Sequence, residues 1–456
     1  MNSLSAVTDS FVDIPDGLDI PGLSILLDAG AMRKRLEQTL PAGPTRITAC
    51  HITNFRFRTP TNCTIAYELT AHVEGAPSDV TVHAYARAYS QAAYPQARHK
   101  ALSSRWVVSA IGTSVQMLDE LYAVLYWYPN DERLSGLRGI AAPRKLQRLF
   151  YQNLSDFPSA SWRISDRSIR LSLLRYKPER RAVLRCRFRA HRLGTAEQHE
   201  LFVFLGVYED VRAAQLSGLI ARLTERLNNA TELSLPRTIA CVPDAGLLVS
   251  EVAPGDTLQL LLSENTAFAA EAINRSANAI ARLHRVAAGS DIPANPGHEA
   301  RLFETVELIG RLAPDCLRTA REIADQLGRD GLISGANRSV IHGDLHPGQI
   351  LLSDARTTLV DLDRTRYGDP LEDIGNFCAQ LRLGPPGGPL WDPDTVQSRF
   401  LSAYERSTSR RIDQHALSRW IAFALLRAGV IPLGRFQPNW RAAMKDILAA
   451  AQERLQ

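Results

Sequence analysis

The sequence has 456 residues, long enough for two or three domains that each bury a core. Apolar residues make up 45% and charged residues 22%, fractions typical of a folded globular protein rather than a disordered or fibrous one. The formal net charge of +5 is small for this length and the arginines are scattered, so we expect no nucleic-acid partner.

The first thirty residues form a mixed N-terminal extension without a basic start followed by an apolar stretch, so no signal peptide is expected. The six cysteines are scattered and none forms a CxxC pair, which argues against a zinc site and suits a reducing cytoplasm. Late in the chain, the apolar residues 420–434 are interrupted by Arg427 and are too short to span a bilayer. They predict a buried helix and no membrane partner.

Two regions in the first half of the chain alternate apolar and polar residues, which predicts half-buried antiparallel strands. These regions, residues 54–89 and 173–208, match each other without a gap at an offset of 119. The matched pairs are Arg56 with Arg175, Phe57 with Tyr176, Arg58 with Lys177, Ala71 with Ala190, His72 with His191, and Tyr89 with Tyr208.

A looser match follows each region. LYWYPND (residues 125–131) resembles SEVAPGD (residues 250–256), with Pro129 on Pro254 and Asp131 on Asp256. We therefore infer an internal duplication of a sheet-rich unit. The alternative is that two hairpins look alike because they share a binary pattern, but charged and turn residues among the matches favour duplication.

The second half of the chain has a helical character. Residues 257–335 are rich in Ala, Leu, Arg and Glu at helical spacing, and helices are expected again from Leu371 to the end, around a loop at residues 383–394. Between them, residues 340–363 contain two short apolar runs around turns. The Pro254–Gly255 turn is the expected hinge before this helical half.

The stretch VIHGDLHPGQILL (residues 340–352) carries the candidate chemistry. Phosphoryl transfer to a hydroxyl needs an oriented acceptor and Mg²⁺ to neutralise phosphate charge. Asp344 is a carboxylate for the hydroxyl, and Gln349 offers an amide oxygen to the metal. Asp361 ends a second apolar run, which can pair with Ile350–Leu352 and return beside the loop. Asp363 follows on the same face if the strand continues.

HGDLHPGQILL followed by LVDLDRTRYGDPLEDIGNF resembles the aminoglycoside phosphotransferase and choline kinase family, which has a protein-kinase-like fold. The resemblance implies that Asp344 is the catalytic base or orienting residue and that Asp361 is the main Mg²⁺ ligand. Gln349 stands where most members carry Asn, as in the similar maltokinase branch. Asp373 would be a buried carboxylate that braces the loop. Asp363 is either a second metal ligand or an ordinary solvated carboxylate. Loop histidines such as His342 and His346 are more often structural than catalytic.

The family's phosphate-binding lysine precedes a Val-Tyr pair, but here Gly206 precedes Val207–Tyr208, and Arg87 takes that position in the first copy. One interpretation is that a cation of the turn RYKPERR replaces the lysine, and the candidates are Lys177, Arg180 and Arg181. Another is a pseudokinase that binds nucleotide without fast transfer. An ordinary basic hairpin turn is the third.

The resemblance also places Glu251 and Val252 at the adenine edge of the interlobe linker. Glu225 is a candidate partner for the missing lysine. Four acidic residues near the proposed site would suit a cationic acceptor or form an ordinary solvated surface: Asp369, Glu372, Asp392 and Asp394.

We therefore predict an α+β, protein-kinase-like two-lobe fold with an extra N-terminal small-lobe-like domain. The expected parts are an N-terminal extension (1–30), a degenerate small-lobe-like repeat with a packing or capping role (31–150), a kinase-like small lobe (151–253) and a helical large lobe (254–456). The expected function is an ATP–Mg²⁺-dependent kinase that acts on a hydroxyl of a small molecule such as a sugar, aminoglycoside or amino alcohol. The alternative is a nucleotide-binding pseudokinase with a scaffold or regulatory role. No oligomeric state is predicted.

Overall fold

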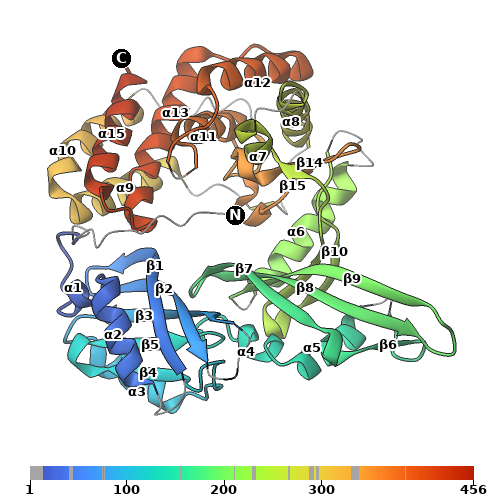
Figure 1. Ribbon diagram of the computed structural model, residues 1–456. Helices are drawn as coiled ribbons and strands as arrows, with labels where there is room; N and C mark the ends of the chain where they lie inside the picture. The colour runs from blue at the N-terminus through green and yellow to red at the C-terminus, as the bar shows by residue number, and fades with distance from the viewer. Residues whose placement is uncertain are drawn as a thin grey trace.

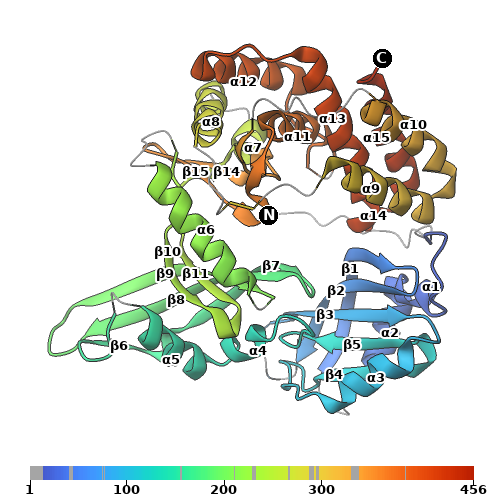
Figure 2. The ribbon, with the colours of Figure 1, turned by 180° about the vertical axis from the view of Figure 1, so that it is seen from behind.

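The computed structural model describes residues 14–40, 45–73, 75, 78–154, 157–209, 211–227, 233–264, 268–286, 292–293, 297–329, 338–385 and 387–456. Two antiparallel sheets lie side by side below a mostly helical lobe (Figures 1 and 2). The predicted α+β organisation is confirmed. Residues 1–13 of the predicted N-terminal extension lie outside the described residues.

The first sheet is built from the N-terminal part of the chain, in the order β1-β2-β3-β5-β4. The interior strand β2 is buried on both faces: Ile65 and Tyr67 belong to one hydrophobic cluster, and Ala66 between them belongs to another. The elements of this part are α1 (Leu23–Leu26), α2 (Ala29–Thr39), β1 (Thr45–Thr59), β2 (Asn62–Val73), β3 (Val80–Tyr89), α3 (Tyr94–Ser103), β4 (Val115–Leu118), β5 (Ala123–Trp127), α4 (Gly136–Ile140) and α5 (Pro143–Asn153).

The second sheet has the order β10-β11-β9-β8, and both β6 and β7 pair with β8. On β8, Ala182, Leu184, Cys186 and Phe188 are buried in a core of their own, and the residues between them face away from that core. The elements are β6 (Trp162–Ile164), β7 (Arg170–Lys177), β8 (Arg181–Arg192), β9 (Gln198–Tyr208), α6 (Arg212–Leu227), β10 (Thr238–Val242) and β11 (Leu247–Glu251).

From β7 onward the second sheet repeats the order of elements in the first: three strands, a helix and two strands. The register also agrees at an offset of 119 for two pairs of the first hairpin, before an irregularity beside its turn, and along the second pairing. Corresponding pairs are Phe57–Cys63 with Tyr176–Ala182, and Asn62–Tyr89 with Arg181–Tyr208. This shared register supports the predicted duplication, because a common binary pattern alone does not fix which residues pair.

The looser match at the end of each sheet is off by one residue. Leu118 pairs with Ala123 and Val242 with Leu247, which gives an offset of 124 rather than 125 over these strands. The turns between them agree, because Tyr122 and Gly246 both have left-handed backbones, with φ of 49° and 55°. Over the strands, the predicted match of LYWYPND with SEVAPGD is therefore one position out of register.

The large lobe consists of helices around a small β insert. Gly255, in the predicted hinge, has φ of 99°, and a Cβ there would lie 2.1 Å from the Leu352 carbonyl oxygen, so the close approach to β14 requires glycine. The elements are β12 (Asp256–Thr257), α7 (Leu258–Ser263), α8 (Ala269–Leu283), α9 (His298–Leu312), α10 (Leu317–Arg329), β13 (Ser339–Ile341), β14 (Ile350–Leu352), β15 (Thr357–Leu359), β16 (Arg366–Gly368), α11 (Pro370–Leu383), α12 (Pro393–Thr408), α13 (Gln414–Ala428), α14 (Ile431–Gly434) and α15 (Trp440–Glu453).

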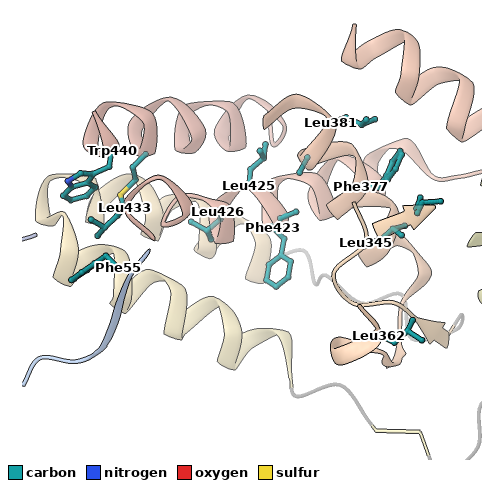
Figure 3. Packing of buried hydrophobic residues seen from close by; sticks show 14 of the residues in the cluster. Phe55, Leu345, Leu362, Phe377, Leu381, Phe423, Leu425, Leu426, Leu433 and Trp440 are labelled. Carbon is teal, nitrogen blue, oxygen red and sulfur yellow. The ribbon is translucent and has the colours of Figure 1, made fainter. Parts of the chain in front are cut away.

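The first sheet and the large lobe share one hydrophobic core. Phe55 of β1 lies near Leu433 of α14 in Figure 3, and the same cluster continues through Phe423 to Leu345 and Leu362 beside the candidate site. The Asn54 amide also donates to the Gly434 carbonyl oxygen at 2.9 Å. The N-terminal sheet is therefore fixed to the helical lobe as well as to its neighbouring sheet.

One helical segment, Gln414–Gly434, is long and apolar enough to cross a membrane, with a mean hydropathy of 1.4. In the structure 72% of it is buried inside the protein, and α13 within it packs against α11 and α15. The predicted burial of residues 420–434 as core helix is confirmed.

Candidate active site

The loop that carries Asp344 is held from below by a buried carboxylate. Asp373 of α11 accepts hydrogen bonds from the backbone N–H groups of His342, at 2.6 Å, and Gly343, at 2.8 Å. Burial favours a raised pKa for Asp373, but its hydrogen bond with His284 holds the pKa below the ordinary value. The predicted bracing role of Asp373 is confirmed by these contacts.

Gly343 must be glycine for the loop to turn here. Its φ is 78°, and a Cβ would lie 2.1 Å from Nη1 of Arg366 and 2.3 Å from the carbonyl oxygen of Arg364. The following residue, Asp344, keeps 39% of its side chain exposed. The turn therefore presents the Asp344 carboxylate to solvent while its backbone stays packed.

The two loop histidines have structural roles, as predicted. His342 Nε2 donates to the Val360 carbonyl oxygen at 2.9 Å, which ties the loop to the segment after β15. His346 Nδ1 accepts from the Gly348 N–H at 3.1 Å, and burial lowers the pKa of His346 to about 4. Because it accepts this bond and stays neutral at physiological pH, His346 shapes the turn that leads to Gln349.

The predicted hairpin that returns Asp361 to the loop is present. β14 and β15 pair antiparallel, and Gln349 Nε2 lies 2.9 Å from Asp361 Oδ2. The strand does not continue to Asp363 as expected, because Asp361 has a left-handed backbone (φ 63°) and a short 3₁₀ turn follows. Asp361 and Asp363 nevertheless converge on one point. The prediction that both carboxylates face the same side therefore holds, but a turn and not a continuing strand brings them together.

That point is occupied by the guanidinium of Arg181, the first residue of β8. Arg181 Nη2 donates to Asp361 Oδ2 at 2.5 Å, and Nη1 donates to Asp363 Oδ2 at 2.6 Å and also to Asp361 Oδ1. Although burial opposes it, this pairing keeps the pKa of Asp361 well below its usual value. Of the three predicted phosphate-binding cations, Arg181 is the one in contact with the predicted metal ligands.

Lys177 and Arg180 line the same cavity but have different neighbours. Burial, together with the positive charges of Arg175, Arg181 and Arg180, lowers the pKa of Lys177 to about 8. Burial and the positive charges of Arg364 and Arg181 lower the pKa of Arg180, and the carboxylate of Asp344 opposes this shift. The structure thus brings all three cations to the proposed phosphate region.

The place of the family's lysine is filled by an aromatic ring. A Cβ on Gly206 would lie 2.7 Å from Cε2 of Tyr208 and 3.1 Å from its hydroxyl oxygen. Tyr208 is almost completely buried, with 9% exposure. The ring therefore covers the position from which a lysine would have started.

Glu251 ends β11 and Val252 begins the linker to β12, and their role toward adenine stays a prediction. Glu251 Oε1 accepts from the Arg237 N–H at 3.1 Å, and Val252 is 38% exposed. Glu225 is exposed in the last turns of α6 and is absent from the wall of the cavity that contains Asp344. The structure therefore does not bring Glu225 to the site.

The four acidic residues considered for a cationic acceptor are engaged elsewhere. Asp369 and Asp392 cap the N-termini of α11 and α12. Glu372 pairs with Arg301 and Arg366, and Asp394 pairs with Arg382. None of the four lines the cavity that contains Asp344, and their role toward an acceptor stays a prediction.

A cavity of about 770 Å³ joins these groups, between the first sheet, the β7–β8 turn, α6 and the catalytic loop. Several residues of its wall could not be predicted from sequence patterns. Arg56 and Arg58 belong to the first sheet, and Arg212 and Gln215 lie in the first turn of α6. For this turn the sequence indicates a helix after the third strand, but not which of its side chains reach the cavity. The wall contains Arg56, Arg58, Arg133, Lys177, Glu179, Arg180, Arg181, Tyr208, Glu209, Val211, Arg212, Gln215, Asp344, Asp361, Asp363 and Arg364.

The donor atoms fit Mg²⁺. Within the described part of the chain, buried Asp363 Oδ1 has no hydrogen-bond partner, and no group of three or more His, Cys, Asp or Glu side chains is arranged around a metal position. Two carboxylates and one amide match the usual Mg²⁺ site, where substrate phosphates and water complete the shell. Gln349 would have to turn its amide over, since its nitrogen now faces Asp361.

Comparison with known proteins agrees with this geometry. The model of the phosphotransferase enzyme family (APH) matches residues 162–410, from β6 to just past α12, and leaves the first sheet outside. No curated protein matches.

Three solved structures illustrate the likeness. The macrolide 2′-phosphotransferase MphH from Brachybacterium faecium is 18% identical, with 68% of this chain and 97% of that chain covered and a TM-score of 0.43. For the choline kinase from Cryptosporidium parvum these values are 12%, 68%, 94% and 0.48. For the aminoglycoside phosphotransferase APH(3″)-Id from Streptomyces rimosus they are 16%, 56%, 92% and 0.40.

Proposed function

Because the chain belongs to the phosphotransferase enzyme family, we propose that it transfers the terminal phosphoryl group of ATP to a hydroxyl of a small molecule, with Mg²⁺. The observation that carries this proposal is one shared cavity. Asp344, Asp361 and Asp363 line it opposite Lys177 and a group of arginines, so an acceptor carboxylate, metal ligands and phosphate-binding cations face each other.

Asp344 has the role of orienting the acceptor. As the acceptor oxygen bonds to the γ-phosphorus, the bond from phosphorus to the β,γ-bridging oxygen breaks and ADP leaves. The hydroxyl proton passes to the Asp344 carboxylate, which is exposed and rigidly mounted. Arg364, whose Nη1 lies 3.6 Å from Asp344 Oδ1, helps to fix this carboxylate.

Asp361, Asp363 and Gln349 would hold Mg²⁺, which neutralises charge on the transferred phosphoryl group when bound. Arg181 must then move from these carboxylates toward the phosphates. In that position its two parallel N–H groups suit phosphate oxygens, which makes it the replacement for the lysine absent at Gly206.

The acceptor class proposed here is a sugar, aminoglycoside or amino alcohol, in line with the family. A cytoplasmic location suits an ATP-dependent enzyme, and all six cysteines are free thiols.

A nucleotide-binding pseudokinase is the second candidate, and one observation favours it. Arg181 binds both predicted metal ligands at once, while Tyr208 covers the position of the missing lysine. If Arg181 does not leave Asp361 when nucleotide binds, the carboxylates stay unavailable to Mg²⁺ and transfer is blocked.

The test compares the unmodified protein with the Asp344→Asn variant. We expect Mg²⁺-dependent transfer to at least one acceptor in a panel of sugars, amino alcohols and aminoglycosides, and a fall in kcat of about 10²- to 10⁴-fold in the variant. The Kd for ATP should stay within about twofold, because Asp344 faces the acceptor. Asp394→Asn, an exposed carboxylate paired with Arg382, is the matched control.

Nucleotide binding without transfer to any acceptor would favour the pseudokinase. Neither binding nor transfer would reject both candidates.

A further inference from the structure

The tip of the β7–β8 turn is inserted into the first sheet through one buried acidic side chain. The Glu179 carboxylate is fully buried, with 0% side-chain exposure, and it lies among cations of β1 and β3. Arg56 Nη2 donates to Glu179 Oε2 at 2.9 Å, Arg58 Nη2 donates to the same oxygen, and Arg87 Nη1 lies 3.2 Å from Oε1. Burial raises the pKa of the Glu179 carboxyl, and the charges of Arg87, Arg58 and Arg56 oppose this rise.

The backbone of Glu179 is held at the same place. Its N–H donates to Asp131 Oδ2 at 2.8 Å, and the Tyr176 hydroxyl donates to that oxygen at 2.8 Å. Asp131 belongs to the first repeat and is completely buried, and its other oxygen accepts from the N–H groups of Arg133 and Leu134. Side chain and backbone of one turn residue are thus both bound by the neighbouring domain.

Glu179 also has a backbone that disfavours its residue type. Its φ is 60°, in the left-handed region where glycine is the usual occupant and other residues are strained by roughly 1 kcal/mol or more. A hairpin turn with no task beyond reversing the chain would be better served by glycine. Here a carboxylate occupies a strained position from which it reaches three arginines.

The internal repeat shows which positions of the second sheet correspond to these arginines. By the shared register, Arg87 occupies in the first sheet the position of Gly206 in the second, where the family's phosphate-binding lysine is expected. Arg56 corresponds by register to Arg175 of the phosphate-covering hairpin. Arg58, which aligns with Lys177 in the sequence, lies in an irregularity of β1 beside the turn, where Thr59 has the paired position of Lys177. The first sheet therefore has a cationic cradle at the place equivalent to a phosphate site, and a carboxylate of the same chain fills it.

We propose that Glu179 is a positioning residue, which the arginine cradle of the first sheet binds in order to hold the Lys177–Arg181 turn over the phosphate region. The functional half of this inference rests on the proposed nucleotide binding. The first sheet then serves the reaction by fixing the turn that covers the phosphates, a position that a glycine-rich loop takes in protein kinases.

The first measurement is amide hydrogen exchange of the turn in the absence of nucleotide. Glu179→Gln keeps the shape of the side chain and removes its charge, and we expect about tenfold faster exchange at the amides of Glu179 and Arg180. Glu132→Gln is the matched control, because Glu132 also pairs with Arg87 but does not lie on the turn. It should leave the exchange of these two amides unchanged.

The second measurement is the Kd for ATP, which should rise about tenfold in Glu179→Gln and stay unchanged in Glu132→Gln. The KM for the acceptor should not change. A general loss of folding would alter this KM as well, so the two explanations can be distinguished. If Glu179→Gln does not fold, the double variant Glu179→Gln/Arg58→Gln restores the charge balance of the cradle, and the same increases are expected in it.

Unchanged exchange in the folded variant overturns the inference. Faster exchange with an unchanged Kd overturns its functional half, since the turn would then not serve the phosphates. If the unmodified protein binds no nucleotide, the proposed function fails, and exchange alone still decides whether Glu179 anchors the turn.

Discussion

Arg181 and Asp361 are bound to each other through two parallel contacts that join the small and large lobes, with Nη2 2.5 Å from Oδ2. A guanidinium therefore stands where Mg²⁺ is expected, held by the carboxylates proposed to bind the metal. Arg181 cannot bind these carboxylates and the phosphates of a nucleotide at the same time. Nucleotide and metal must therefore compete with this ion pair.

Replacing Arg181 by Met should have two opposite effects. The kcat/KM for ATP should fall about 100-fold, because a bidentate phosphate contact is lost. Mn²⁺ binding without nucleotide, followed by electron paramagnetic resonance, should become tighter, because Asp361 and Asp363 lose their competitor. Arg185→Met, on the exposed face of the same strand, should change neither quantity. Unchanged Mn²⁺ affinity in Arg181→Met would contradict the competition.

Introducing the family's lysine at Gly206 should destabilise the protein. The new Cβ would lie 2.7 Å from the Tyr208 ring, and overpacking of this kind costs about 1–3 kcal/mol. Urea denaturation of Gly206→Lys should show this loss, and Tyr208→Ala in the same chain should recover part of it. Gly139→Lys is the control, because a Cβ at Gly139 meets nothing within 4 Å. Equal losses at both glycines would show that the ring is not the obstacle.

Binding of ATP should take up protons through Lys177. Burial and neighbouring arginines lower the pKa of Lys177 to about 8. At pH 8 the Lys177 side chain is therefore neutral in about half of the protein molecules. Bound phosphates raise the pKa again, which predicts an uptake of about 0.5 proton at pH 8 and close to one at pH 9. Calorimetry in buffers with different ionisation enthalpies measures this number. The same uptake in Lys177→Arg would assign it to another group.

Stability should depend on pH through Asp369. Burial raises the pKa of Asp369 to about 6, so the folded state binds this proton more tightly than the unfolded state does. The stabilising effect of the protonated form is complete below the ordinary pKa near 4 and is lost as pH rises through 6.

Asp369→Asn keeps an acceptor for the Leu371 N–H but cannot ionise. Relative to the unmodified protein, it should gain about 2 kcal/mol in free energy of unfolding between pH 4.5 and pH 7.5. Urea denaturation at both pH values measures this gain. A difference that does not change with pH would show that Asp369 titrates normally in the folded protein.

The local features of this protein could be predicted from its sequence. The repeat at an offset of 119, the hairpin of Ile350–Leu352 with the run before Asp361, and the buried helix near Trp420 follow from periodicity and turn residues. These signals depend on neighbours along the chain, so the sequence contains them directly.

The long-range charge pairs could not be predicted. Nothing in the sequence around Glu179 indicates that it enters another domain, and an acidic residue in a turn is normally solvated. The sequence offers Lys177, Arg180 and Arg181 equally as replacements for the phosphate-binding lysine, and the contact of Arg181 with Asp361 is visible only in the structure. The prediction that Glu225 lies at the site was wrong because the position of a residue within the helix decides whether it reaches the site. The sequence does not determine how α6 packs on the sheet. The domain boundaries stay predictions.

The cradle around Glu179 has a consequence for the order in which the chain is synthesised. The strands of the first sheet are complete at Trp127, before the ribosome has made residue 179. N-terminal domains generally begin to fold during synthesis. A nascent first sheet therefore holds Arg56, Arg58 and Arg87 close together before Glu179 exists. Glu132 is made early enough to pair with Arg87, but Arg56 and Arg58 lack their carboxylate, so this edge of the nascent sheet carries excess positive charge until the second hairpin emerges.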